Sequence, residues 1–137
     1  MSDFSKYLIK DYTYWHVAVH PNQGYLGRCV IWCKREDALD LADATSEERE
    51  ELFIILQKLR EASKKAFQPD WFNYAFLGNE TCHLHSHFIP RYSSPRQFND
   101  MEFFDKEWGH NWQSDSSFVS IPELWGAVRS ELLKFLQ

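Results

Sequence analysis

The sequence of 137 residues has few cysteines, a deficit of positive charge and no long apolar run. Its three cysteines, Cys29, Cys33 and Cys82, do not form the even set of a disulfide framework, and they favour a reducing compartment. Lys and Arg number 15 against 20 Asp and Glu, so the net charge is −5 at pH 7. This balance supplies no basic surface, so neither nucleic acid nor an anionic membrane is the expected partner. A small molecule that carries phosphate stays compatible with it, because a local site can oppose the net charge.

The apolar runs are far shorter than the roughly 20 residues that span a bilayer. Met1–Lys10 also lacks the apolar segment of a signal peptide. We therefore expect a cytoplasmic protein. No internal repeat or low-complexity linker divides the chain, so a single domain over residues 1–137 is predicted.

Aromatic residues, by contrast, are abundant and make up 17% of the chain. They are too many for a small core alone, so some should line a pocket or an interface. Residues 93–119 are especially rich in them and are predicted to be irregular. We expect this segment to pack back over the sheet or across a dimer interface.

The predicted elements give an α+β fold with a mostly antiparallel sheet and helices packed on one face. Runs of β-branched and aromatic residues predict four strands: Thr13–Val19, Gly27–Cys33, Trp71–Leu77 and Cys82–Ile89. Pro90 and Pro95 are expected to end the sheet.

Capping signals define two helices. Thr45 and Glu48 form a capping box for a helix that ends near Gln68. Ser120 and Glu123 predict a second capping box, for a helix that runs to about residue 136.

The most informative feature is a row of three histidines, His83, His85 and His87, on the last predicted strand. Alternate residues of a strand share one face, so the three imidazoles point the same way, roughly 6.5–7 Å apart along the strand. The intervening residues, including Cys82, should face the core on the other side. Three imidazoles on one face are costly to bury without partners, which favours a functional site.

Two kinds of chemistry fit such a row. A His-x-His pair can hold zinc, with further ligands from His16, His20, His110 or Glu80, although the outer histidines lie roughly 13 Å apart and cannot share one ion. Alternatively, one imidazole can attack phosphorus while its neighbour protonates the leaving group. The turn before the strand would then supply donors for phosphate oxygens from its backbone, Asn79 and Thr81.

Residues 83–91, His-Leu-His-Ser-His-Phe-Ile-Pro-Arg, resemble the motif of the histidine triad (HIT) superfamily, His-φ-His-φ-His-φ-φ, in the variety that ends in Pro-Arg. The resemblance covers about residues 12–92, in the order hairpin, helix, strand and triad strand. It leaves the aromatic segment and final helix, residues 93–137, outside that core. Ser86 departs from the usual apolar residue, which affects packing more than chemistry.

This resemblance implies a HIT-like domain and a role for each histidine. His85 would attack the α-phosphorus of a nucleotide derivative and form a nucleotidyl-histidine intermediate. His87 would contact the phosphate and the leaving-group oxygen as a donor. His83 would hold His85 in the right tautomer, partly through its backbone carbonyl.

Further residues are assigned to the nucleotide by the same resemblance. Asn73 and Asn79 would bind phosphate oxygens, and Asn22 would face the ribose hydroxyls. Arg28 stands where many members carry a fourth histidine. It is either a phosphate contact or a surface residue, and Arg91 is either a contact of the leaving group or part of an ion pair.

The implied function is hydrolysis of a nucleotide phosphoanhydride or phosphoramidate, with a dinucleoside polyphosphate as the best single substrate. A HIT-type transferase or phosphorylase would use the same intermediate, and a metal-dependent hydrolase that uses the His-x-His pair is the alternative from another class. The resemblance also implies a homodimer. No cofactor is expected to be required, although a divalent cation can accompany a polyphosphate substrate.

Overall fold

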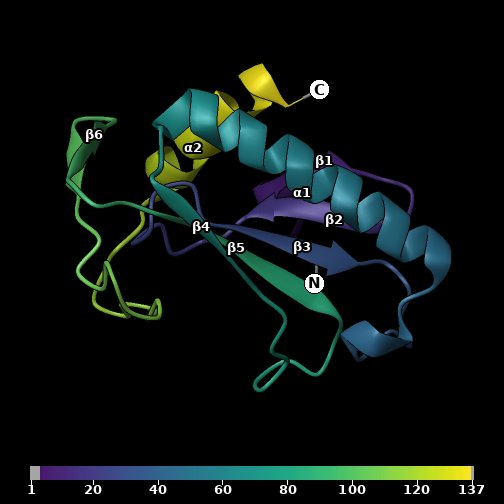
Figure 1. Ribbon diagram of the computed structural model, residues 1–137. Helices are drawn as coiled ribbons and strands as arrows, with labels where there is room; N and C mark the ends of the chain where they lie inside the picture. Colours follow the sequence, from purple (N-terminus) through teal and green to yellow (C-terminus); the bar gives the residue numbers. More distant parts are fainter. Residues whose placement is uncertain (1–3, 137) are drawn as a thin grey trace.

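The computed structural model describes residues 4–136 and has the predicted α+β fold, with two helices over one face of an antiparallel sheet (Figure 1). Residues 1–3 and 137 lie outside this range. The predictions for the domain of residues 1–137 and for the segment Met1–Lys10 therefore extend in part beyond the described residues. The sheet has the strand order β1-β2-β3-β5-β4. Its strands are β1 (Leu8–Asp11), β2 (Trp15–Val19), β3 (Cys29–Cys33), β4 (Trp71–Ala75) and β5 (His85–Arg91).

Three predicted strands, β2, β3 and β4, are confirmed with slightly shorter ends. β1 was not predicted; it pairs antiparallel with β2. Two short 3-10 helices, Phe4–Tyr7 and Leu41–Asp43, complete the connections in this half of the chain.

The long helix α1 (Ser46–Phe67) begins with the predicted capping box. The Thr45 hydroxyl accepts the Glu48 N–H at 3.1 Å, and the Glu48 carboxylate accepts the Thr45 N–H at 2.9 Å. Leu52, Ile55 and Leu59 then lie buried on one side of this helix. Within residues 4–136, no helix combines the length and the apolar character needed to cross a membrane.

The second predicted capping box is wrong. Helix α2 (Pro122–Phe135) has Ile121 at its N-cap, and no side chain caps it. The Ser120 hydroxyl instead accepts the backbone N–H of Gln23 at 2.8 Å, a partner 97 positions away in the sequence. The apolar side chain of Ile121 has no acceptor for the N–H groups of the first turn, so the helix begins without a side-chain cap.

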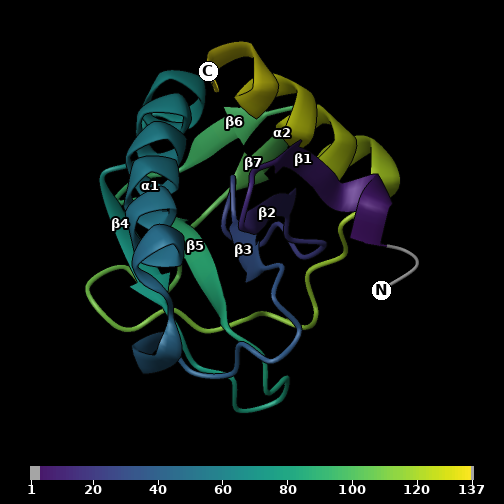
Figure 2. The ribbon, with the colours of Figure 1, turned by 90° about the vertical axis from the view of Figure 1, so that its right-hand side faces the viewer.

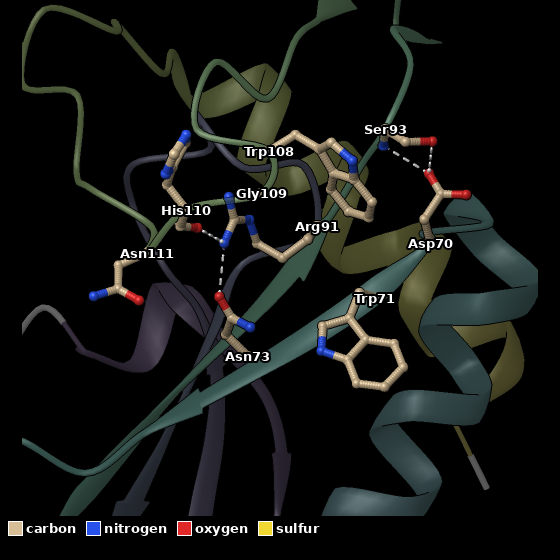
Figure 3. A pocket seen from close by; sticks show the side chains of 9 residues that line it. All are labelled: Asp70, Trp71, Asn73, Arg91, Ser93, Trp108, Gly109, His110 and Asn111. Carbon is tan, nitrogen blue, oxygen red and sulfur yellow. Dashed lines mark hydrogen bonds between the residues drawn. The ribbon is translucent and has the colours of Figure 1, made fainter.

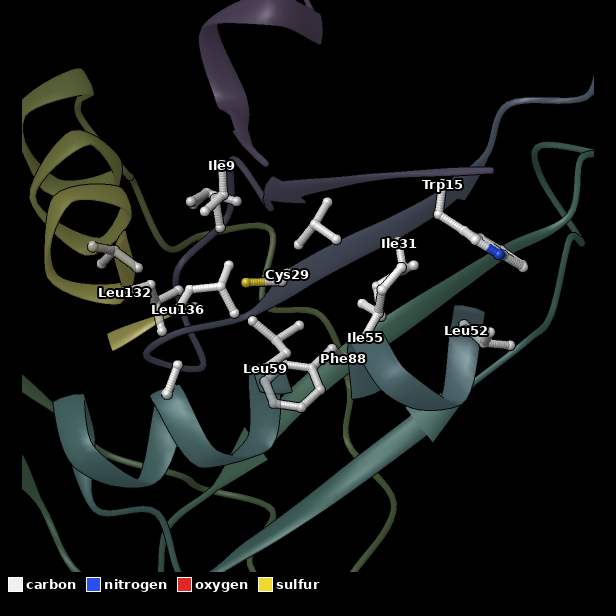
Figure 4. Close-up of a cluster of buried hydrophobic side chains, with 14 of the residues drawn as sticks. Ile9, Trp15, Cys29, Ile31, Leu52, Ile55, Leu59, Phe88, Leu132 and Leu136 are labelled. Carbon is white, nitrogen blue, oxygen red and sulfur yellow. The ribbon is translucent and has the colours of Figure 1, made fainter. Parts of the chain in front are cut away.

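The core lies between the helices and one face of the sheet (Figures 2 and 4). Cys29 and Ile31 of β3 and Phe88 of β5 are fully buried on this face. In the register of β3 with β5, Ile31 is opposite Ser86, whereas Trp32 is opposite His85. The alternation therefore turns the histidine row toward the opposite face from the helices.

The triad strand differs from its prediction at both ends. It begins at His85 and not at Cys82, because the Leu84 N–H donates to the carbonyl of Ala38 at 2.9 Å and the chain turns there. Cys82 is exposed and does not belong to the core. Pro90 lies within β5, beyond the last residue paired with β3, so its missing N–H costs no hydrogen bond on that side.

The aromatic segment contains a hairpin that the sequence did not predict. Strands β6 (Arg96–Phe98) and β7 (Met101–Phe103) are joined by Asn99 and Asp100, both with positive φ, 55° and 61°. Such a pair is typical of a type I′ turn, but strands of three residues give too weak a pattern to be recognised. Phe103 packs into the main core, which ties the segment to the sheet as expected.

The capping box predicts the effect of a substitution at Thr45. Thr45→Ala should lower the free energy of unfolding by about 1 kcal/mol, because the Glu48 N–H loses its acceptor. Urea denaturation measures this change. Ser46→Ala, at an exposed neighbouring position, is the matched control and should stay within about 0.5 kcal/mol; equal losses in both variants would contradict the role of the cap.

Candidate active site

The first two triad histidines are oriented by backbone carbonyls. His85 Nδ1 lies 2.6 Å from the carbonyl oxygen of His83, and His83 Nε2 lies 2.6 Å from that of Cys33. A carbonyl oxygen only accepts, so each of these ring nitrogens carries its proton and donates. The neutral His85 ring therefore keeps its lone pair on Nε2, which is the state a nucleophile needs.

Trp32 fixes the planes of the same two rings. Its indole stacks on His83 with centroids 4.2 Å apart and on His85 with centroids 5.3 Å apart. Trp32 is the direct partner of His85 across the β3–β5 pair, so the sheet register itself places the indole there. His85 is only 8% exposed, which limits the orientations open to its ring.

The third histidine, His87, lies against a buried cation. Its Nδ1 is 3.5 Å from Arg28 Nη2, and its ring is 5.2 Å from that of His85. The guanidinium can only donate, so this contact favours the tautomer of His87 with its proton on Nε2. Burial, Arg28 and His85 together lower the pKa of His87 to about 4, so the ring is neutral at pH 7.

His20 joins this group from the end of β2. Its ring lies 5.9 Å from that of His87, and burial, Arg28 and His87 lower its pKa to about 3. From the sequence, His20 is predicted only as a possible metal ligand. The pairing of β2 with β3 could have located His20 in the site. The His20 N–H donates to the carbonyl of Arg28 at 2.9 Å, directly after the last β2–β3 pair, so the two residues are neighbours across the hairpin.

These side chains surround an open hollow of about 590 Å³. Six residues predicted from the sequence line it: Asn22, Arg28, Asn79, Thr81, His85 and His87. Seven further residues line it: Leu77, Gly78 and Glu80 precede the triad strand, and four others were missed as parts of this site, His20, Trp112, Ser114 and Ser116. The last three come from the aromatic segment, and no local pattern in the sequence shows which of its residues meet the triad.

Asn22 lies at the hollow with its amide already engaged. Its Nδ2 donates to the carbonyl of Asp115 at 2.9 Å, and its Oδ1 accepts the N–H of Gly24 at 2.8 Å. It therefore fastens the aromatic segment to the turn after β2, and its contact with a ribose stays a prediction.

A second hollow, of about 700 Å³, is lined by two of the three remaining predicted residues, Asn73 and Arg91, whereas the third, His83, is among the lining residues of neither hollow (Figure 3). Arg91 donates to Asn73 Oδ1 at 2.8 Å and to the carbonyl of His110 at 2.9 Å. It also forms a buried ion pair with Asp105 at 2.8 Å. The structure thus gives Arg91 the ion pair that was one of its two alternatives, and it leaves both residues outside the hollow lined by His85 and His87.

The metal alternative needs three or more ligating side chains in one place. Among residues 4–136, no three His, Cys, Asp or Glu side chains gather as such a group. His20 and His87 approach each other, but the charged group beside them is the guanidinium of Arg28. A cation at this position disfavours a metal ion.

Comparison with known proteins places this geometry in a family. Residues 12–94 match the HIT domain. The chain belongs to the HIT family. The structure of this HIT chain is similar to that of a histidine triad protein from Marinobacter aquaeolei, with a TM-score of 0.76 at 18% identity over 100% of this chain and 96% of that one. It is also similar to a hypothetical histidine triad nucleotide-binding protein from Sulfolobus tokodaii, with a TM-score of 0.71 at 14% identity over 95% and 83% of the two chains.

Curated relatives of the HIT chain include the bis(5'-adenosyl)-triphosphatase of Saccharomyces cerevisiae, which is 33% identical over 101 residues. The match covers 65% of this chain and 48% of that protein. The HIT chain thus spans about half the length of the curated relatives that it matches.

The two buried imidazoles predict how the stability of the HIT chain depends on pH. His20 and His87 have folded pKa values of about 3 and 4, whereas unfolded histidine titrates near 6.5. Between these values the unfolded chain binds more protons than the folded one, so the free energy of unfolding should fall as the pH is lowered from 6.5 to 4.

Urea denaturation at pH 7, 5.5 and 4.5 measures this dependence. The double variant His20→Asn, His87→Asn should lose less stability over this range than the parent chain, because it lacks the two titrating groups. An equally steep loss in both proteins would show that other groups control it.

Proposed function

We propose that this chain is a nucleotide hydrolase that cleaves a phosphoanhydride or phosphoramidate through a nucleotidyl-histidine intermediate on His85. One observation carries the proposal: the His83 carbonyl holds the proton of His85 on Nδ1, at 2.6 Å, and leaves Nε2 as a nucleophile beside His87. The HIT family membership of residues 12–94 and the name of the yeast relative, bis(5'-adenosyl)-triphosphatase, support this class of substrate.

In the first step, the Nε2 lone pair of His85 attacks the α-phosphorus as the bond from phosphorus to the leaving group breaks. From a phosphoanhydride the leaving group departs as a phosphate anion, and the Nε2–H of His87, whose ring is neutral at pH 7 because its pKa is about 4, donates a hydrogen bond to the departing oxygen and keeps its proton. The His85 ring gains positive charge in this step, and its Nδ1–H donation to the His83 carbonyl stabilises that charge.

In the second step, water attacks the phosphorus of the intermediate. The bond from phosphorus to His85 Nε2 breaks, the His85 ring loses its positive charge, a nucleoside monophosphate is released, and the proton lost by water passes to the solvent. Asn79 and Thr81, which line the same hollow, would donate to the phosphate oxygens in both steps. Both steps use only these side chains and water, so we propose that no cofactor is required and that a divalent cation only accompanies a polyphosphate substrate.

Among nucleotide substrates, a dinucleoside polyphosphate is the one we favour. The hollow has room for a phosphate chain, at about 590 Å³, and it is lined by both neutral donors and the cation of Arg28. A transferase or phosphorylase would share the first step and differ only in the acceptor of the second.

The variant His85→Ala should reduce turnover of diadenosine triphosphate by about 1,000-fold or more, since the covalent route is lost. Its affinity for AMP should stay within about tenfold, because little binding surface is removed. Chromatographic product analysis and calorimetry measure the two effects. His110→Ala, at an exposed side chain in the second hollow, is the control and should keep normal turnover.

Three results decide between the alternatives. Normal turnover by His85→Ala would refute the assignment. Loss of wild-type turnover on chelation, without trapped phosphohistidine, would favour a metal-dependent hydrolase. Incorporation of added inorganic phosphate into ADP, with a matching loss of AMP, would identify a phosphorylase.

We also propose that the protein is a homodimer joined at β4. This strand is an edge of the sheet, so one side of its backbone has no neighbouring strand. Beside it, Phe53 of α1 is 63% exposed and Tyr74 is 40% exposed, at a groove with mostly apolar lining between α1 and β4. An antiparallel pair of two β4 strands would satisfy the edge and bury both grooves by a single two-fold axis.

The variant Phe53→Glu should convert the dimer to a monomer, because it would place two carboxylates in an apolar interface. Sedimentation equilibrium measures the mass. Phe104→Glu, at a phenylalanine that is 59% exposed on the aromatic segment, is the matched control and should stay dimeric. A monomeric wild-type protein would contradict the proposal.

A further inference from the structure

Two arginines of this chain are almost completely buried, and only one has a counterion. Arg91 is 4% exposed and forms a two-point ion pair with Asp105, with distances of 2.8 and 3.1 Å. Arg28 is 3% exposed, yet among residues 4–136 no carboxylate forms an ion pair with it. The chain thus buries one guanidinium charge that nothing in the described protein neutralises.

The contacts of Arg28 are neutral and use only part of its hydrogen-bonding capacity. Nη1 donates to the Ser114 hydroxyl at 2.9 Å, Nη2 faces His87 Nδ1, and the indole of Trp112 lies 4.8 Å from the guanidinium carbon. Nε is buried and has no partner among the described residues. A guanidinium has five N–H donors, so it can still bind an anion at two points.

A buried charge without a counterion is unfavourable, and burial lowers the pKa of Arg28 to about 10, which still leaves the group charged at pH 7. His20 and His87, which line the same hollow, are neutral. Glu80 also lines the hollow, but its side chain is exposed, and none of the ion pairs in residues 4–136 joins it to Arg28. An anion that enters from the hollow would supply the missing partner.

The contact with His87 indicates which phosphate this anion is. Under the proposed function, His87 Nε2–H donates a hydrogen bond to the leaving-group oxygen, and Arg28 approaches the other nitrogen of the same ring. We infer that Arg28, with Ser114 and Trp112, forms a binding site for the leaving-group phosphate. This site selects substrates whose leaving group is a phosphate chain over substrates that release a neutral amine. This inference rests on the proposed function and narrows its substrate class to phosphoanhydrides.

The test compares two substrates with the same adenylyl group, diadenosine triphosphate and adenosine 5′-phosphoramidate. Arg28→Gln keeps a side chain of similar polarity but removes the charge. It should lower kcat/KM for diadenosine triphosphate by about 10- to 100-fold, the value of one or two charge-assisted hydrogen bonds, and that for the phosphoramidate by less than about threefold. Arg28→Lys should recover part of the loss, and Arg129→Gln, at an arginine of α2 that donates to the carbonyl of Leu8, is the matched control.

Calorimetry on the His85→Ala background provides a readout that needs no turnover. With Arg28 intact, ADP should bind about tenfold or more tightly than AMP, and Arg28→Gln should remove this difference. An equal loss for both substrates, or an unchanged preference for ADP, would overturn the inference and leave Arg28 a structural residue. Absence of wild-type activity on both substrates would overturn the proposed function, while the comparison of ADP with AMP would still test Arg28.

Discussion

Strand β5 has to satisfy two opposite requirements at once, because its side chains alternate between the core and the site. Ser86 and Phe88 are fully buried under the helices, and they hold the strand in one register. His85 and His87 then project from the opposite face without any freedom to exchange places, since a slip of one residue would bury the imidazoles. The helices α1 and α2 therefore fix the geometry of the site from the opposite face of the sheet, by holding β5 in its register.

The site also depends on backbone carbonyls more than on acidic side chains. The carbonyls of Cys33 and His83 orient two imidazoles at 2.6 Å each. A carbonyl oxygen only accepts, so it sets the tautomer of each ring without adding a negative charge beside it. This arrangement suits the proposed binding of an anion next to a buried cation.

The two buried arginines, Arg28 and Arg91, differ in the charge of their partners. Asp105 neutralises Arg91, which joins β5 to the aromatic segment and supports Asn73 at the second hollow. Arg28 contacts a hydroxyl, an imidazole and an indole, all of them neutral. One arginine therefore stabilises the fold, and the other leaves positive charge available in the hollow.

Local patterns in the sequence predicted much of this fold. The capping box at Thr45 and the β-branched runs depend on neighbours within a few residues, and the structure contains them. The predicted cap at Ser120 failed because its hydroxyl was taken by Gln23, a partner that no local pattern reveals. The hairpin β6–β7 and the strand β1 were missed because short strands are stabilised by packing more than by their own pattern.

For the site, the sequence by itself determined the histidine row, its common face and the residues of the turn before it, because strand alternation is a local property of the backbone. Only the tertiary structure decided which distant side chains share the hollow: it brought Trp112 and Ser114 onto Arg28 and moved Asn73 and Arg91 to a neighbouring hollow. It also decided the charge state of the site, because burial and the absence of a carboxylate beside Arg28 depend on contacts between segments far apart in the chain.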